Sequence, residues 1–190
     1  KVAQARFIGI AVPMHTALRL GVRLVERIRA LNPTCHICCY GLYATLNAEY
    51  LLAHGVDSVI GGEYEAPLVA LIESLDAGTE NPVIGVSQHG RDAGPFLKRM
   101  DFRVPSRSAL PPLELYAHLE RDGVRNRVGY VEASRGCKHH CLHCPIPPVY
   151  GGKFFAVPQQ VVLDDIRSLA QLGAEHITFG DPDFLNGPTH

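Results

Sequence analysis

The stretch VGYVEASRGCKHHCLHCP, residues 128–145, decides how the second half of the chain is organised. Residues 128–134 predict a strand, because β-branched and aromatic residues alternate there with small and polar ones. Three cysteines follow the strand within eight residues, Cys137, Cys141 and Cys144, in the spacing C-x3-C-x2-C. Apolar residues at helical spacing over residues 159–172 then predict a helix. A strand that leads into a cysteine loop and then a helix is typical of an α/β unit.

The cysteine spacing limits the chemistry of this loop. Three thiolates can hold three irons of a cubane [4Fe–4S] cluster and leave the fourth iron open to a substrate or cofactor. A zinc site completed by His139, His140 or His143 and a set of inert buried thiols are the alternatives. We do not expect disulfides, because no segment looks like a secretory signal. The spacing favours the cluster.

This segment closely resembles the radical S-adenosylmethionine (SAM) enzymes. In that family the open iron chelates the amino and carboxylate groups of SAM, and an electron from the cluster cleaves SAM to a 5′-deoxyadenosyl radical. The resemblance implies that Cys137, Cys141 and Cys144 are the cluster ligands. It also implies a partial (β/α) barrel with its site at the C-terminal ends of the strands, and an electron donor such as a flavodoxin or ferredoxin as partner.

The same resemblance assigns residues to SAM itself. His143 occupies a position that is usually aromatic in the family, where it would contact the adenine; the alternative is an exposed loop histidine. Gly180, Asp181 and Asp183 follow a strand expected at residues 176–179, where relatives bind the SAM amino group. A carboxylate suits an ammonium group, with Asp181 as the first candidate and Asp183 as the second. The alternative is an ordinary Asp-Pro turn.

The first 78 residues alternate strand and helix. The expected strands are residues 7–12, 35–40 and 56–60, and the expected helices are residues 16–31, 47–54 and 67–75. Continuous apolar runs indicate buried parallel strands, so we predict a Rossmann-like, doubly wound α/β domain. Leu20, Leu24, Ile28 and Leu31 recur at helical spacing and predict the core face of the first helix.

This half resembles the cobalamin (B12)-binding domain found in front of many radical SAM domains. The resemblance places the cofactor over loops that follow three strand ends, with the residues Met14, His15, Thr16, Tyr40, Gly41, Gly61, Gly62 and Glu63. Glycines at such loops allow close approach of a large ligand; ordinary turn chemistry is the alternative. The Asp-x-His-x-x-Gly motif that supplies a cobalt-ligating histidine in other branches is absent, so we expect no histidine on the cobalt.

A second cysteine set does not predict a metal site. On a strand, Cys35 and Cys39 share one face and Cys38 points to the other, so the three thiols cannot converge. Free cysteine is among the most buried residue types, and we interpret these three as core residues.

The domain organisation follows from these segments. Residues 1–78 form a partial B12-binding-type domain, residues 79–126 a proline-rich linker, and residues 127–190 the start of a truncated radical SAM barrel. Within the linker we expect a hairpin beginning near residues 83–86 and a short helix over residues 113–119. One strand–helix–strand unit cannot close a barrel, so we expect an internal piece of a longer protein.

Composition excludes several classes of protein. The chain has 46% hydrophobic and 19% charged residues and a net charge of −1, as in a globular protein without a basic field for nucleic acid. No apolar run reaches membrane-spanning length. Six cysteines without a recognisable secretory signal indicate a reducing compartment, and we expect the cytoplasm.

The combined hypothesis is a radical SAM enzyme that cleaves SAM at a [4Fe–4S] cluster, depends on cobalamin and methylates carbon. Its substrate is not indicated, and we expect the 190-residue piece alone to be inactive. One alternative is a radical SAM enzyme whose α/β domain has lost cobalamin. The other is a non-catalytic zinc or iron–sulfur module.

Overall fold

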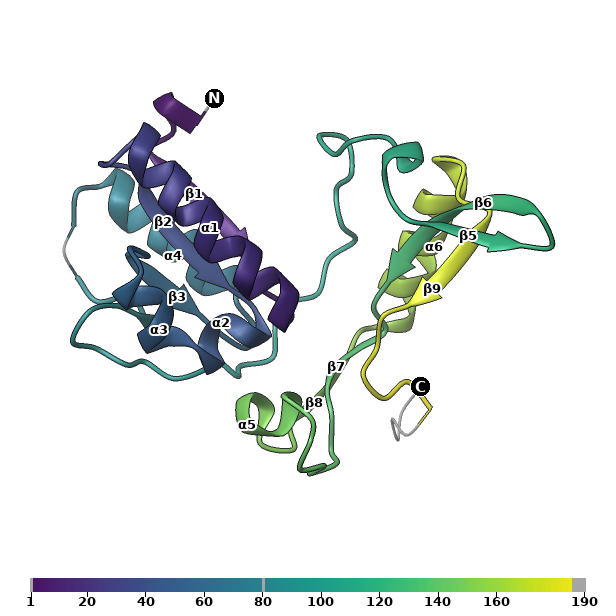
Figure 1. The fold of residues 1–190 in the computed structure, drawn as a ribbon. Coiled ribbons are helices and arrows are strands. Elements are labelled where there is room, and N and C mark those ends of the chain that lie inside the picture. The colour runs from purple at the N-terminus through teal and green to yellow at the C-terminus, as the bar shows by residue number, and fades with distance from the viewer. Residues whose placement is uncertain (1, 80, 186–190) are drawn as a thin grey trace. The chain divides into compact units, whose positions relative to one another are not determined.

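A computed structural model describes residues 2–79 and 81–185 (Figure 1). The chain forms two compact units. The first unit contains Lys1–Met100 and His139–Gly151, and the second contains Asp101–Lys138 and Gly152–His190. The chain therefore leaves the second unit within the cysteine loop, after Lys138, and returns to it at Gly152, shortly after that loop.

The first unit is built on a four-stranded sheet with the order β1-β2-β3-β4. Its elements are η1 (Val2–Gln4), β1 (Phe7–Ala11), α1 (His15–Leu31), β2 (His36–Tyr40), α2 (Leu42–Leu46), α3 (Ala48–Ala53), β3 (Ser58–Ile60), α4 (Glu65–Asp76), β4 (Val86–Ser87) and α5 (Ile146–Tyr150). The first three strands are parallel, and β4 runs antiparallel to β3. Parallel strands connected by helices confirm the α/β class.

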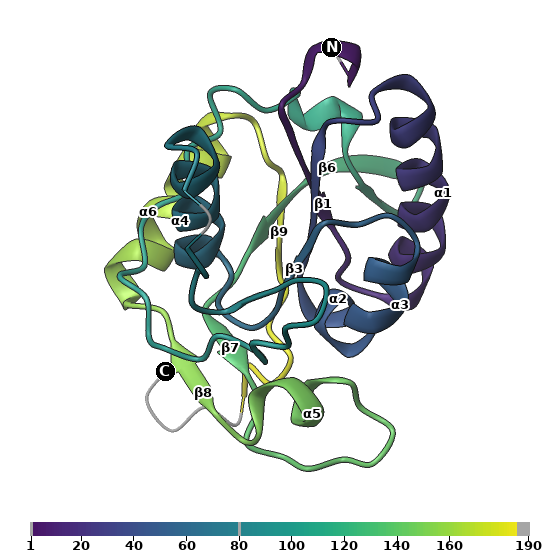
Figure 2. The same ribbon diagram turned by 90° about the vertical axis from the view of Figure 1, so that its left-hand side faces the viewer.

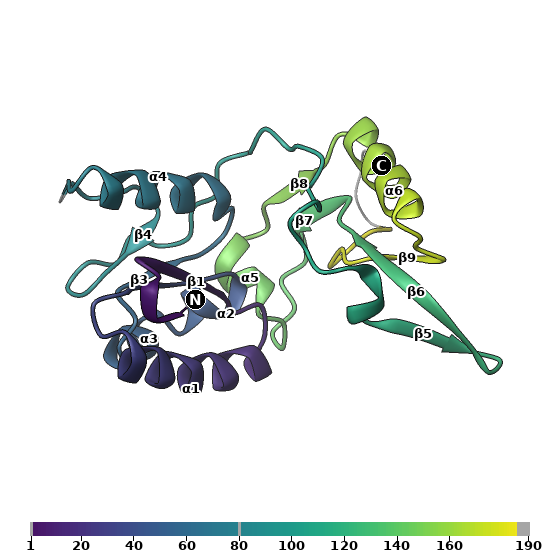
Figure 3. The same cartoon turned by 90° about the horizontal axis from the view of Figure 1, so that it is seen from above.

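Helices cover both faces of this sheet, with α1 and α3 on one side and α4 on the other (Figures 2 and 3). Cys35 and Cys39 belong to the core cluster beneath α1, and Cys38 belongs to the cluster that contains Leu71 of α4. The prediction that these thiols alternate between faces and are buried is therefore confirmed.

The predicted core face of α1 was wrong in three of its four positions. Leu20, Leu24 and Leu31 are 60%, 45% and 65% exposed, and only Ile28 of that set is buried. The core side carries Gly21, Val22, Val25 and Ile28 instead. A Cβ added at Gly21 would lie 3.7 Å from Ile10 and 3.9 Å from Val12, which indicates close approach of α1 to β1. Small and β-branched residues suit such close packing better than leucine.

The second unit contains two small sheets. Its elements are η2 (Leu113–Leu115), β5 (His118–Arg121), β6 (Val124–Val131), β7 (Ser134–Gly136), β8 (Phe154–Ala156), α6 (Gln159–Gln171) and β9 (His176–Phe179). Strand β6 pairs in parallel with β9, and α6, which connects them, packs against β6 through Leu169 and Val162. Strands β7 and β8 form a separate antiparallel pair. The expected strand–loop–helix–strand order is present.

The segment expected to be a linker contains more structure than the sequence predicted. The helix expected over residues 113–119 ends after one 3-10 turn, and strand β5 begins at His118. This strand and β6 form an antiparallel hairpin whose turn residues, Asp122 and Gly123, both have positive φ angles of 51° and 77°. An Asp-Gly pair between two β-forming runs is a strong hairpin signal that the sequence analysis missed. Where a hairpin is expected to begin near residues 83–86, β4 adds to the first sheet, and an antiparallel turn closed by Gln88 and Arg91 follows it.

A buried ion pair holds the irregular segment 101–117 against α6. Arg107 donates two hydrogen bonds to Asp165, whose side chain is 7% exposed, and a third contact to the carbonyl of Tyr130. Two hydrogen bonds to one carboxylate satisfy the charge that burial would otherwise penalise.

None of the helices in residues 2–79 and 81–185 combines the length and the apolar composition that a membrane-spanning helix requires.

We expect Asp165→Ala to lower the free energy of unfolding by about 3 kcal/mol, because it leaves Arg107 buried without its carboxylate. Urea denaturation followed by circular dichroism measures this change. Asp164→Ala is the matched control, since Asp164 pairs with exposed Arg167 on the same helix and should cost less than about 1 kcal/mol. Equal losses for the two variants would contradict a special role for the buried pair.

Candidate functional site

The carboxylate of Asp181 ties the C-terminal ends of β6 and β9 together. It accepts hydrogen bonds from the Ala133 amide at 3.0 and 3.1 Å and from the Ser134 hydroxyl at 2.5 Å. Parallel pairing brings the two ends to the same edge, because β6 and β9 run in register from Val128↔His176 to Val131↔Phe179. Asp181 therefore fixes the point at which the chain leaves β6 for the cysteine loop.

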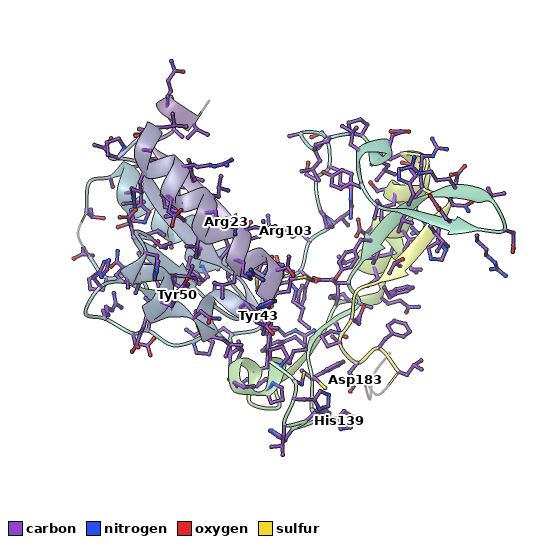
Figure 4. All side chains as sticks on the ribbon, in the orientation of Figure 1. Arg23, Tyr43, Tyr50, Arg103, His139 and Asp183 are labelled. Carbon is purple, nitrogen blue, oxygen red and sulfur yellow. The ribbon has the colours of Figure 1, made fainter. Side chains whose placement is uncertain are left out.

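The thiol of Cys137 lies against the second carboxylate of this segment. Its Sγ donates to Oδ2 of Asp183, which Figure 4 labels, at 3.5 Å. Cys137 is 9% exposed. Gly180 lies between the two strand ends, since its amide donates to the carbonyl of Val131 and its carbonyl accepts from the Tyr130 hydroxyl. The contacts thus distinguish the first and second candidates for the SAM amino group: Asp181 binds Ala133 and Ser134 at the start of the cysteine loop, and Asp183 faces a cysteine.

The other two cysteines belong to the first unit. Cys141 is exposed and Cys144 is partly buried, and the Cys144 amide donates to the Cys141 carbonyl at 3.2 Å in a turn. His143 is exposed, as are His139 and His140. Within residues 2–79 and 81–185, no group of three His, Cys, Asp or Glu side chains is placed to hold a metal ion. The structure therefore brings Cys137 to Asp183 in the second unit, while Cys141 and Cys144 belong to the first.

Helix α5 follows the cysteine loop directly and packs against α2 of the first unit. It ends where Gly151 adopts the left-handed conformation, with φ of 56°. Its last residue, Tyr150, donates from its hydroxyl to Oε1 of Glu63 at 3.1 Å. The sequence analysis assigned no role to Tyr150, and no local pattern reveals a partner 87 residues away.

The ends of the three parallel strands in the first unit meet at one edge. The Val12 amide donates to Tyr40, the Gly41 amide to Ile60 and the Tyr43 amide to Val12. Met14, which caps α1, is exposed together with His15 and Thr16, whereas Tyr40 and Gly41 are partly buried. The segment expected to be a loop after Tyr40 is largely helix α2, which carries Tyr43 (Figure 4). The side of this edge that contains Met14, His15 and Thr16 is open to solvent.

The glycines at this edge serve the packing of the chain itself. A Cβ at Gly61 would lie 2.1 Å from the hydroxyl of Thr45, and one at Gly62 would lie 2.3 Å from the carbonyl of Phe96. Gly62 also has a φ of 74°, which favours glycine. Glu63 is completely buried. The close approach at Gly61 and Gly62 is therefore made by Thr45 and Phe96, not by a ligand.

Cys35, which precedes β2, and Cys38 and Cys39 within it are buried thiols of low reactivity. Burial raises the pKa of Cys38 to about 11 and that of Cys39 to about 12, and it also raises the pKa of Cys35. A thiol whose pKa lies this far above neutrality is protonated and a poor nucleophile. These residues do not resemble a reactive or metal-binding set.

We expect iodoacetamide at pH 8 to alkylate exposed Cys141 in the metal-free folded protein within minutes and to leave Cys38 and Cys39 unmodified. Their raised pKa values keep the buried thiols neutral at this pH. Mass spectrometry of tryptic peptides measures the modification, and unfolding in guanidinium should make all three react. Rapid modification of Cys38 in the folded protein would contradict the burial.

The two aspartates should differ in their effects. Asp181→Ala should lower the amount of iron that the full-length protein takes up during anaerobic reconstitution, because it frees the backbone at Ala133 and Ser134. Asp183→Asn removes only a charge and should leave iron uptake near the level of the unsubstituted protein. Iron analysis measures the iron uptake, and calorimetric titration with SAM measures the affinity for SAM. The resemblance to radical SAM enzymes makes Asp183 a candidate for binding the SAM amino group, so we expect SAM affinity about tenfold lower in Asp183→Asn from the loss of a charged hydrogen bond. An unchanged affinity would make Asp183 a turn residue.

Sequence comparison finds two methyltransferase relatives, although no family model matches the chain. The chain is 28% identical over 158 residues to hopanoid C-3 methylase of Methylococcus capsulatus, a match that covers 80% of this chain and 30% of that protein. It is 26% identical over 165 residues to an uncharacterized methyltransferase of Pyrococcus horikoshii, with 81% and 35% covered. The chain thus spans about a third of the length of these relatives.

Structure comparison finds the same kind of protein. The radical SAM methyltransferase TsrM of Kitasatospora setae, solved with tryptophan and a SAM analog, matches with a TM-score of 0.69 and 19% identity over 95% of this chain and 38% of TsrM. TsrM solved with cobalamin and a [4Fe–4S] cluster matches with a TM-score of 0.70 and 18% identity over 96% and 39%. The resemblance inferred from the sequence is confirmed: the chain is similar in sequence to methyltransferases and in fold to a cobalamin-binding radical SAM methyltransferase.

Proposed function

We propose that this chain is part of a cobalamin-dependent radical SAM enzyme that methylates a carbon atom of its substrate. The observation that carries the proposal is the position of Cys137, the first residue of the C-x3-C-x2-C motif, beside Asp183 at the C-terminal ends of two parallel strands. The methyltransferase relatives and the fold of TsrM support it.

The donor set fits an iron–sulfur cluster. Cys137, Cys141 and Cys144 lie on one short loop and none is in a disulfide, and thiolates are the ligands that such clusters take. We assign them as the three ligands of a [4Fe–4S] cluster, which when bound supplies the electron that cleaves SAM. Asp181 fixes the start of the loop through the Ala133 amide and the Ser134 hydroxyl.

Asp183 is our first candidate for binding the amino group of SAM. Binding a metal removes the proton of a cysteine, so a bound Cys137 would place a thiolate beside the carboxylate of Asp183. Two negative groups in contact favour a cation nearby, and the ammonium group of SAM is one. This reverses the order expected from the sequence, because the carboxylate of Asp181 already accepts bonds from Ala133 and Ser134. His143 is exposed and available to stack on the adenine.

The open strand-end edge of the first unit is the proposed cobalamin site. Met14, His15, Thr16, Tyr40 and Gly41 are the residues of this edge that can contact the cofactor, which would carry the methyl group. Gly61, Gly62 and Glu63 are buried and would act by packing beneath it. We expect no histidine on the cobalt, with His15 the residue that could contradict this.

The remaining features of the proposal concern the complete protein. The chain would contribute the later part of a Rossmann-like cobalamin domain, a connecting segment and the first strands of a partial (β/α) barrel. The reaction requires a one-electron donor of the flavodoxin or ferredoxin type. The substrate stays undefined, since the chain spans about a third of its relatives.

We expect Cys137→Ala, Cys141→Ala and Cys144→Ala each to abolish the cluster in the anaerobically reconstituted full-length protein, because the loop then supplies two thiolates. Cys35→Ala is the control, since this thiol is buried in the core of the first unit, directly before β2. Iron and sulfide analysis and the broad absorption band in the blue measure the cluster. Equal loss of iron in Cys35→Ala would overturn the ligand assignment.

The same spectra test cobalamin. After loading with hydroxocobalamin and desalting, we expect corrin bands in the unsubstituted protein, in His15→Ala and in the cysteine variants. Full-length protein that keeps its cluster but no corrin would favour a radical SAM enzyme without cobalamin. Bound zinc without either chromophore would favour a non-catalytic module.

A further inference from the structure

The hydrogen bond between Tyr150 and Glu63 has no part in the assignments above. Glu63 is 0% exposed, and the phenol of Tyr150 donates to its Oε1 at 3.1 Å. Burial of a polar group is costly unless it is hydrogen-bonded, so this contact contributes to keeping the carboxylate inside the first unit.

The loop that carries Glu63 has little freedom to move. The Glu63 amide donates to the Phe96 carbonyl at 2.7 Å, and the Phe96 amide donates to the Gly61 carbonyl at 2.9 Å. Gly62 between them has a left-handed φ of 74° and no room for a Cβ against Phe96. The carboxylate of Glu63 is therefore a fixed point at the end of β3.

The partner residue is close to the cysteine loop in the chain. Tyr150 is the last residue of α5, a helix that begins two residues after Cys144. Val149 of the same helix is 2% exposed, and α5 packs against α2. A short helix held by a buried side chain at its end moves as one body, so a contact at Tyr150 restrains Cys144.

We propose that Tyr150 is a positioning residue: its bond to Glu63 anchors the second half of the cysteine loop to the Gly61–Glu63 loop. Because this bond joins the two loops, a cluster bound by the cysteines would stabilise the Gly61–Glu63 loop. The Gly61–Glu63 loop would in turn stabilise the cysteine loop. Such a coupling is reciprocal by thermodynamic necessity. The linkage rests on the proposed cluster, but the anchor does not.

Hydrogen–deuterium exchange of the full-length, metal-free protein tests the anchor. Tyr150→Phe removes one hydroxyl and leaves Glu63 buried with one donor fewer. We expect amides of residues 61–63 and 142–149 to exchange about five- to tenfold faster, as for the loss of one buried hydrogen bond, with β2 unchanged. Tyr116→Phe is the control, because this tyrosine is 45% exposed in the other unit and should change neither segment.

Cluster loading tests the linkage. In the unsubstituted protein and in Tyr116→Phe, anaerobic reconstitution should slow exchange both at residues 137–144 and at residues 61–63. In Tyr150→Phe it should slow exchange at residues 137–144 alone.

Each outcome has one interpretation. Unchanged exchange of residues 61–63 and 142–149 in Tyr150→Phe would overturn the anchor, and so would a uniform increase that includes β2, since that is a loss of overall stability. Protection of residues 61–63 by the cluster in Tyr150→Phe would overturn the linkage. Protein that takes up no iron would contradict the proposed function and the linkage together, while the metal-free comparison still decides the anchor.

Discussion

Parallel pairing of strands is the constraint on which both units depend. In the first unit it brings the ends of β1, β2 and β3 to one edge, and in the second it does the same for β6 and β9. The residues with proposed chemistry lie at these ends or in the segments that follow them. Side chains from distant parts of the sequence meet there because parallel strands need long connections that return to the same side.

Two carboxylates at these edges hold the neighbouring segments in place by accepting hydrogen bonds. Asp181 accepts three hydrogen bonds from the start of the cysteine loop, and Glu63 accepts one from the helix that follows the loop. Both carboxylates therefore serve as fixed acceptors for the two ends of the segment that contains Cys137, Cys141 and Cys144. Asp183 differs from them in that it contacts a thiol, that of Cys137. Its position beside a proposed ligand makes it the better candidate for a charged cofactor.

Much of the fold followed from local patterns, and the departures have physical causes. Strand β9 matched the prediction at both ends, and α6 differed by one residue, since apolar periodicity is a local property of the chain. The core face of α1 was wrong because leucine is apolar but too large for a helix that lies close to β1 at Gly21. Strand β5 was missed because its exposed residues lack the apolar alternation of a buried strand, although Asp122 and Gly123 mark its turn.

The sequence by itself determined the cysteine motif, its place after a strand, the α/β alternation and the inert character of Cys35, Cys38 and Cys39. These features depend on spacing along the chain, which the sequence contains in full. Only the tertiary structure decided that Asp181 binds backbone while Asp183 faces Cys137, that Gly61 and Gly62 make room for Thr45 and Phe96, and that Glu63 is buried against Tyr150. The partner of a polar side chain depends on which residues sheet pairing brings together across tens of positions, and no local spacing encodes that choice.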